Sequence, residues 1–293
     1  MHLIDKVERI LEENDYSYSE YSGCFDIAAR KREMLLLKVL DNIDSFQEEQ
    51  SRNLRVLSSG LDASAFLVGH HTRRENLVNN IIYERFGVFA MTSVTLENII
   101  TNDIPSLYRN KGGLFAEVNP EKLRQRRAAA GLSQAALARK LGISKKSVYE
   151  HESRKMRTEY NTVQRMEQLI GDVTDPINMD MTDNEIKNPP KDGFQRIVSR
   201  DMKSIGLDTN FVTQSPFNII AHSENFLIMS DAEERAQRAE RNAPFLQSLA
   251  KTTKKPILAV TKDELDIDIP SIAEHELREF DTMSELRRFL KRW

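Results

Sequence analysis

The sequence has little that would tie the protein to a membrane, to a disulfide framework or to a metal cluster. Cys24 is the single cysteine in 293 residues, which excludes an internal disulfide and a cysteine-rich metal site. No apolar run approaches the roughly 20 residues of a membrane-spanning helix. The first residues include acids and lack the apolar core of a signal peptide. We therefore expect a cytoplasmic protein with no membrane contact and no cofactor.

The net charge of −3 hides an asymmetry along the chain. Between Glu121 and Gly171 there are 12 basic and 5 acidic side chains, a local balance of +7, and the remainder carries −10. A basic island attracts phosphate groups, while an acidic remainder resists loose binding to nucleic acid. Charge by itself favours the simpler interpretation of a solvated helical face, and the motif inside this island reverses that preference.

Composition and turn residues predict a multidomain α+β protein in which two related α/β domains flank a central all-α bundle. We expect residues from about 118 to 172 to be helical throughout. Gly112 and Gly113 permit a turn before this helical region, and Pro189 and Pro190 indicate a linker after it. In chain order we predict an α/β domain at 1–105, a flexible strap at 106–119, a helical domain at 120–172, an acidic linker at 173–192 and a second α/β domain at 193–293.

The two flanking domains resemble one another in sequence. The runs Phe25–Ala29 and Met34–Val39 lie about 192 residues before Phe217–Ala221 and Phe226–Asp231. Matching order and spacing predict an internal duplication interrupted by the helical domain, and the alternative is a pair of unrelated α/β domains. Each flank is expected to read helix, strand, strand, strand, helix, strand, strand, helix.

The most informative segment lies inside the basic island. Gly131 suits the end of one helix, and Ser133 suits the N-terminal cap of the next. Gly142 suits a tight turn, and Ser144 suits the cap of a third helix, which Val148 anchors in the core. The second helix buries Leu137, Ala138 and Leu141, and Ala138 must be small because the second and third helices cross closely there.

These residues resemble the Cro/repressor (XRE) helix-turn-helix family. The shared positions are Leu123, Arg127, Gly131-Leu132-Ser133-Gln134, Leu137-Ala138, Leu141-Gly142-Ile143-Ser144, Val148 and Glu152, followed by a helix with Val163, Met166, Leu169 and Gly171. The resemblance covers about 50 residues and more than a dozen spaced positions. It implies binding of double-stranded DNA, whereas the alternative for the same residues is a helical interaction domain without DNA.

The resemblance also implies roles for individual residues. Gln134 would contact a phosphate at the N-terminus of the second helix. The third helix, residues 144–153, would enter the major groove, where lysines donate to guanine and a glutamate accepts from cytosine. The expected DNA-binding residues are Gln134, Ser144, Lys145, Lys146, Ser147, Tyr149, Glu150, Arg154 and Lys155. Arg127 and Glu152 occupy the positions of a structural ion pair in the family.

Two positions depart from the family pattern. Arg154 stands where the family usually has glycine, so we expect a different exit from the third helix, with Arg154 and Lys155 near phosphate. His151 stands where an apolar residue is common, and we interpret it as a partly buried histidine rather than a ligand.

The first flank resembles the PD-(D/E)xK nuclease family, which includes archaeal Holliday-junction resolvases. Asp26 matches the first acid and Lys38 the lysine, but Leu36 replaces the second carboxylate. In the second flank, Asn218, Ile228 and Ser230 are expected at the corresponding places. One carboxylate is poor ligation for Mg²⁺, so we expect a reused fold without catalysis. The alternative is a DNA-processing nuclease or recombination-type protein, or its non-catalytic accessory.

The whole chain resembles a family of archaeal helix-turn-helix transcriptional regulators. The resemblance implies a regulator that works as a homodimer on two half-sites, with the flanks contributing to dimerisation, to effector binding or to the grip on DNA. The basic segment His70–Arg74 is interpreted as a solvated loop, with an additional DNA or anion contact as the alternative. Operator sequence, effector and sign of regulation are left open by the sequence.

Overall fold

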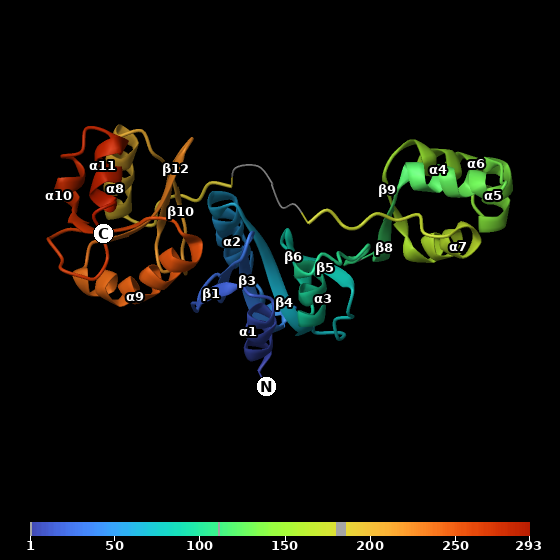
Figure 1. Cartoon of the computed structure of the whole chain (residues 1–293), viewed down its shortest axis with the longest axis horizontal. Coiled ribbons are helices and arrows are strands. Elements are labelled where there is room, and N and C mark those ends of the chain that lie inside the picture. Colours follow the sequence, from blue (N-terminus) through green and yellow to red (C-terminus); the bar gives the residue numbers. More distant parts are fainter. Residues whose placement is uncertain (1, 111, 180–185) are drawn as a thin grey trace. The chain divides into compact units, whose positions relative to one another are not determined.

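The computed structural model describes residues 2–110, 112–179 and 186–293 (Figure 1). Backbone contacts divide the chain into two compact units: Met1–Val68 with Arg85–Val88 and Asp180–Trp293, and Gly69–Glu84 with Phe89–Met179. Both units mix helices with strands, so the protein is of the α+β class. Among the helices of the described residues, none combines the length and the apolar character that crossing a membrane requires.

The first flanking domain begins with an amphipathic helix followed by an antiparallel meander. Its elements in the first unit are α1 (Leu3–Glu13), β1 (Ser17–Glu20), β2 (Ile27–Arg30), β3 (Met34–Asn42), the 3-10 helix Ile43–Ser45, α2 (Glu48–Leu61) and the beginning of β4 (Ala63–His71). Strand β2 pairs with β1 and with β3, and β4 follows β3 in the sheet. Leu3, Val7, Ile10 and Leu11 give α1 its buried stripe.

The second unit contains the rest of that domain and the helical domain. Its further elements are β5 (Ile81–Arg85), β6 (Val88–Met91), α3 (Ser93–Ile100), β7 (Leu107–Asn110), β8 (Gly113–Val118), α4 (Pro120–Ala129), α5 (Gln134–Leu141), α6 (Lys145–Ser153), β9 (Met156–Glu159) and α7 (Tyr160–Ile170). The strands lie in the order β4-β6-β5-β7-β8-β9. Strand β8 pairs antiparallel with β7 and β9.

Two expectations for this region were wrong. The segment from 118 to 172 is not helical throughout, because β9 follows α6, and residues 106–119 are not a flexible strap, because β7 and β8 occupy most of them. The physical reason is burial of one face of this small sheet. Ala116 and Val118 of β8 belong to the same core cluster as Leu123, Leu137 and Val148 of the helices. Extended backbone therefore completes the core of the helical domain.

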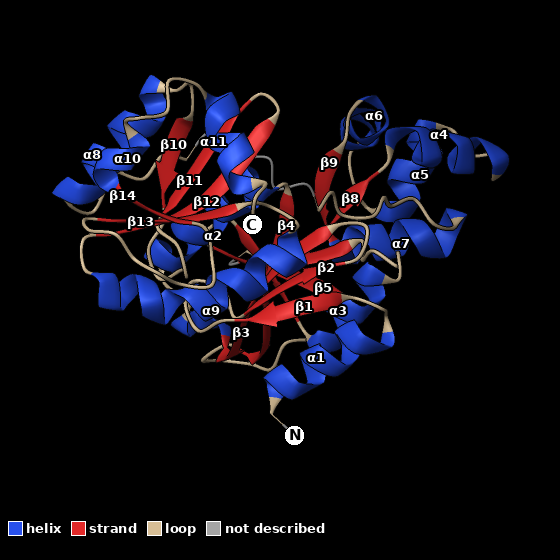
Figure 2. Cartoon of the chain, turned by 60° about the vertical axis from the view of Figure 1, so that its left-hand side comes forward, coloured by secondary structure: helices blue, strands red, loops and turns tan. Residues whose placement is uncertain are grey.

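The second flanking domain repeats the plan of the first. Its elements are α8 (Gly193–Ser204), β10 (Asp208–Phe211), β11 (Ile219–Ser223), β12 (Phe226–Glu233), α9 (Ala236–Thr253), β13 (Ile257–Thr261), β14 (Ser271–Ala273), α10 (Glu274–Leu277) and α11 (Met283–Leu290) (Figure 2). The expected element order is confirmed here, with the short α10 added. In the first flank the expected order missed β5, a five-residue strand.

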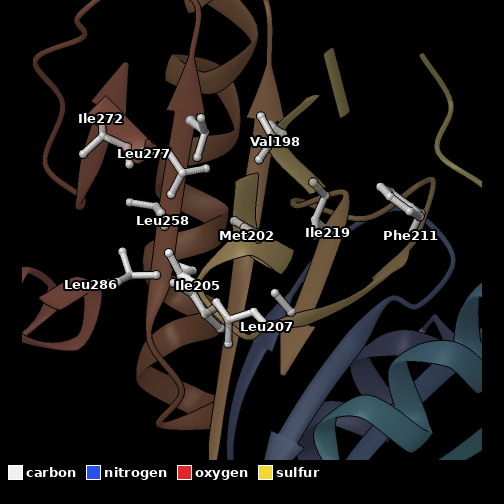
Figure 3. Packing of buried hydrophobic residues seen from close by; sticks show 14 residues of the cluster. Val198, Met202, Ile205, Leu207, Phe211, Ile219, Leu258, Ile272, Leu277 and Leu286 are labelled. Atoms are coloured by element: carbon white, nitrogen blue, oxygen red, sulfur yellow. The ribbon is translucent and has the colours of Figure 1, made fainter. Parts of the chain in front are cut away.

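The second sheet separates two layers of helix. Its core-facing side packs on α8, α10 and α11 through residues such as Val198, Met202, Leu258, Leu277 and Leu286 (Figure 3). Helix α9 contacts β12 and β13 and contributes no residue to that cluster, so it covers the opposite side of the sheet (Figure 1).

Asp231 lies on the side of β12 that α9 covers. Its side chain is buried, with 2% of the residue exposed, and the amide of Asn242 donates to its Oδ2 at 3.0 Å. Burial raises the pKa of Asp231, the Asn242 hydrogen bond lowers it by less, and the charge of Glu233 adds a small increase, so the pKa is about 7. The protonated form therefore fits the folded state better than the carboxylate.

We predict that Asp231→Asn stabilises the protein most above neutral pH. Because the folded-state pKa lies above the unfolded value, the native Asp231 is favourable only at low pH, and its contribution is lost as the pH rises towards and through 7. The neutral amide removes this loss, by up to about 4 kcal/mol at pH 8. Thermal unfolding of the full chain at pH 5 and pH 8 measures the effect, with the exposed Asp266→Asn as control. An equal shift at both pH values would contradict the prediction.

Candidate nucleic-acid interface

The sequence-predicted helix boundaries are realised by caps in α5 and α6. The hydroxyl oxygens of Ser133 and Ser144 accept from the backbone N–H groups of Ala136 and Ser147, at 3.1 and 2.9 Å. Gly131 and Gly142 have φ values of 66° and 68°, in the left-handed region that favours glycine. These local features set the tight connection between α5 and α6.

An ion pair ties α6 to the other two helices of the motif. The guanidinium of Arg127, on α4, donates to both carboxylate oxygens of Glu152, on α6, with the Nη2–Oε2 distance at 3.2 Å. Gln134, at the start of α5, donates its amide to the same Oε2 at 2.7 Å. Burial raises the pKa of Glu152, but hydrogen bonds from Arg127 and Gln134 outweigh burial and lower the pKa. Glu152 is thus a charged, buried anchor.

The two sides of α6 differ sharply in exposure. Val148, His151 and Glu152 are buried, and they follow each other at the three- and four-residue spacing of one helix face. Lys145 and Lys146 are exposed, Tyr149 is 60% exposed, and Glu150 is half-buried. In the part of the chain that the structure describes, neither lysine takes part in an ion pair, so their charges face solvent at the first turn of α6.

His151 is buried more completely than the sequence analysis expected, at 7% exposure. Its Nδ1 lies 3.3 Å from the hydroxyl of Thr158, on β9. Burial lowers the pKa of His151 despite the opposing charge of Glu150. The histidine therefore joins α6 to β9 as a neutral core residue.

The exit from α6 is extended, as the missing glycine indicated. Arg154 has φ −154° and ψ 153° and is exposed, and it leads directly into β9. Lys155 is turned towards Asp175, with 3.1 Å between its Nζ and the carboxylate. The carboxylate of Asp175 also accepts from the amide of Asn119, and its backbone N–H donates to Glu117. The first residues of the expected acidic linker therefore pack on the helical domain.

Several basic residues that the sequence analysis did not single out hold the helices together. Arg124 donates to the backbone oxygen of Glu152 at 2.9 Å, and Arg165 donates to that of Leu141 at 2.8 Å. Both arginines thus satisfy carbonyls at helix C-termini, where cations are favourable. Part of the basic charge in this domain is therefore structural. The feature that indicates such a role is an arginine on one helix beside the C-terminus of another helix.

The nuclease-type residues of the first flank are bonded to one another. Lys38 Nζ lies 2.8 Å from Asp26 Oδ1 and donates to the backbone oxygen of Gly23, and Asp26 Oδ2 accepts from the N–H of Val39 at 2.7 Å. Asp26 and Lys38 are 9% and 7% exposed. Within the described residues, no three histidine, cysteine, aspartate or glutamate side chains gather in an arrangement that could hold a metal ion.

We predict that Arg127→Met destabilises the helical domain by about 3–5 kcal/mol, because it leaves the Glu152 carboxylate buried without its partner. Hydrogen exchange of the α4–α6 amides in the full chain measures this loss locally. The neighbouring Arg126→Met removes the same charge from the exposed side of α4 and serves as the control. Equal exchange rates in the two variants would show that the ion pair contributes nothing.

Comparison with known proteins agrees with these two regions. Residues 1–106 match the model of the PD-(D/E)XK superfamily domain, and residues 121–171 match that of a helix-turn-helix domain. No solved structure matches the chain.

Several archaeal proteins are similar to this chain over nearly its full length. Proteins named "Putative HTH-type transcriptional regulatory protein" from Thermococcus gammatolerans and Methanocaldococcus jannaschii are 29% and 25% identical to this chain. The alignments cover 97% and 99% of this chain, and 94% and 96% of the relatives. A protein of the same name from Archaeoglobus fulgidus is 25% identical over 98% of this chain and 96% of its own. The resemblance is therefore confirmed: residues 121–171 match a helix-turn-helix domain, with which the Cro/repressor pattern agrees, and the whole chain resembles archaeal HTH-type transcriptional regulatory proteins.

Proposed function

We propose that the protein is a cytoplasmic, sequence-specific regulator of transcription that reads the major groove of double-stranded DNA with α6. The observation that carries the proposal is the two-sided character of this helix. One side is fixed in the core by Val148 and Glu152, while Lys145, Lys146 and Tyr149 stand free at its first turns. The names of the full-length relatives support a role in transcription.

The exposed residues of α6 suit base edges in the major groove. A lysine donates to guanine O6 and N7, and a glutamate accepts from cytosine N4. Lys145 and Lys146 carry the first role, and Glu150 the second. Tyr149 adds a flat surface with a hydroxyl group that donates or accepts. The hydroxyls of Ser144 and Ser147 lie 2.8 Å apart, and the backbone N–H of Ser147 donates to the Ser144 hydroxyl oxygen. Both hydroxyls therefore lie at the N-terminal end of α6.

Phosphate contacts complete the interface in this proposal. The amide nitrogen of Gln134 has two hydrogens, and only one is needed for Glu152, so the other is available to a phosphate oxygen. Arg154 is exposed and meets the backbone of DNA from the end of α6. Lys155 first has to leave Asp175, a surface pair that contributes little energy.

The second candidate function is DNA processing, and the match of residues 1–106 to the PD-(D/E)XK superfamily favours it. Against it stands the missing second carboxylate, which is replaced by Leu36, and the bonding of Asp26 to Lys38 and to the N–H of Val39. We infer that the flank is non-enzymatic. The effector expected from the resemblance stays a prediction. The expected homodimer is also untested, and the pairing of the two flanks within one chain, proposed below, is its alternative.

We predict that changing Lys145 and Lys146 together to Ala weakens selective binding at least about 10-fold, because each lysine contact to a base contributes on the order of 1 kcal/mol or more. The probe is a duplex enriched from random DNA by the full chain, and the measurement is gel retardation against bulk competitor. Lys203→Ala with Lys251→Ala removes the same charge from exposed sites of the second flank and serves as the control. Unchanged selective retardation would remove α6 from the reading role.

We predict that plasmid and branched DNA stay intact on incubation with the protein and Mg²⁺ or Mn²⁺. The physical reason is that Leu36 replaces the second carboxylate of the motif, while Asp26 is held in a buried ion pair with Lys38. Cleavage that disappears in Asp26→Ala would establish the DNA-processing alternative instead. Cleavage that persists in Asp26→Ala would identify a contaminating nuclease.

A further inference from the structure

The two flanking domains share their strand register as well as their element order. In the first, the N–H of Asp26 donates to Leu37 and Val39 donates to the Asp26 carboxylate. In the second, the N–H of Asn218 donates to Ser230 and Ala232 donates to the Asn218 amide oxygen. Both long helices end in a left-handed residue, Asp62 after α2 and Lys254 after α9. Such agreement in hydrogen bonds supports duplication of one ancestral domain.

This register corrects the assignment made from sequence. The position in the second domain equivalent to Lys38 is Asp231, rather than Ser230. The position equivalent to Leu36 is Met229, rather than Ile228. The reason is one additional residue between the paired positions of β11 and β12. A shift of one residue turns every side chain of a strand to the other face.

The two copies contact each other through the same helix position and the same strand end. Asn53 of α2 and Phe245 of α9 each lie nine residues before the left-handed cap of their helix. Asn53 donates to the hydroxyl of Thr213, just after β10, at 2.7 Å. Phe245 lies edge-on to Tyr21, just after β1, with ring centroids 5.5 Å apart. Each copy therefore presents the same helix position to the same strand end of the other.

Whole helices and strands of the two copies contact each other in the same reciprocal way. Helix α9 of the second domain packs on β1 and β2 of the first, while α2 of the first packs on β10 and β11 of the second. In the last turn of α2, a Cβ at Gly60 would lie 2.3 Å from Ile220 Cδ1, so the backbone approaches β11 closely. In the last turn of α9, the carbonyl of Thr253 accepts from Arg30 of β2. A surface that contacts its own copy in this way is the hallmark of a two-fold dimer.

The connecting segment is built into this contact. The side-chain amide of Asn188 donates to Asn53 Oδ1 of the first domain and to the backbone oxygen of Phe211 in the second. Asn210 in turn donates to the backbone oxygen of Ile186. The segment that leads into the second domain therefore lies against both partners, which is the arrangement expected for pairing within one chain.

We propose that the two flanks pair with each other as the subunits of a dimer would. The chain consequently reads a single, non-palindromic DNA site with its one helix-turn-helix domain and without a second copy of the protein. This inference rests on the proposed function for its DNA part. Its physical basis is that the self-complementary face is already occupied within the chain. A true dimer would have two helix-turn-helix domains, whereas the duplication within this chain provides a second flanking domain and no second helix-turn-helix domain.

Pairing in this manner also fixes the turn beside the nuclease-type positions. The backbone N–H of Cys24, in the turn before Asp26, donates to the carbonyl of Gln214 in the other domain. A Cβ at Gly23 would lie 2.0 Å from that same carbonyl oxygen. The loop that bonds Lys38 through its Gly23 carbonyl is thus clamped by the second domain.

Cross-linking distinguishes pairing within a chain from pairing between chains. We substitute Asn53→Cys with Thr213→Cys and, in a second variant, Tyr21→Cys with Phe245→Cys, leaving the buried Cys24 in place. Oxidation is expected to give a monomer of altered mobility on non-reducing gels at every protein concentration, in at least one variant. A mixture of the two single variants, Asn53→Cys and Thr213→Cys, should give no cross-link.

Cross-linked dimers that form in the mixture, or no cross-link in either double variant, would overturn the pairing. Light scattering of the protein on the shortest selected duplex is expected to give one chain per duplex, and two chains would overturn the single-site reading. Failure to bind any duplex would instead overturn the proposed function, and with it the DNA part of the inference, while the cross-link still decides how the flanks pair.

Discussion

The carboxylate of Glu152 is the constraint on which the proposed DNA-reading surface depends. It is buried in the middle of the helical domain, and it is held by Arg127 of α4 and Gln134 of α5. A charge in that position tolerates only one rotation of α6 about its axis, because any other rotation would leave it unpaired in the core. The spacing of the helix then turns Lys145, Lys146 and Tyr149 outwards. Exposure of the basic face is thus a consequence of where the acid is buried.

The helix-turn-helix could be predicted from sequence because its determinants are local. Ser133, Gly142 and Ser144 act through bonds or backbone angles within a few residues of themselves. Strand β9 could not be predicted in the same way, since its four residues have meaning only when paired with β8, about 40 residues earlier in the chain. Arg154 in place of glycine did indicate an altered exit from α6, but it did not indicate a strand.

The flanks show the same division between local and distant information. Sequence correctly placed Asp26 and Lys38 beside each other at neighbouring strands, although Asp26 lies directly before β2 rather than in it. It also recognised the second copy from apolar runs. It could not show that the two side chains would satisfy each other, because that depends on rotamers and on the turn at Gly23. The equivalent positions that sequence assigned in β12 were also wrong by one residue. Apolar runs such as Phe226–Ser230 carry no alternation that would fix which face each residue occupies, so only the hydrogen-bonded register reveals Asp231 as the buried partner.

Covalent duplication changes what the pairing of the flanks requires. Two separate subunits must find each other at cellular concentration, whereas linked domains meet at a high effective concentration, so modest contacts such as Asn53 with Thr213 are sufficient. Linked copies are also free to diverge. One copy keeps the pair of Asp26 and Lys38, while the other replaces it with Asn218 and a buried acid at Asp231. Palindromic operators mirror the two-fold symmetry of the proteins that read them. In the proposed arrangement, two paired flanks with a single helix-turn-helix domain impose no such symmetry on the DNA, so the expected site is asymmetric.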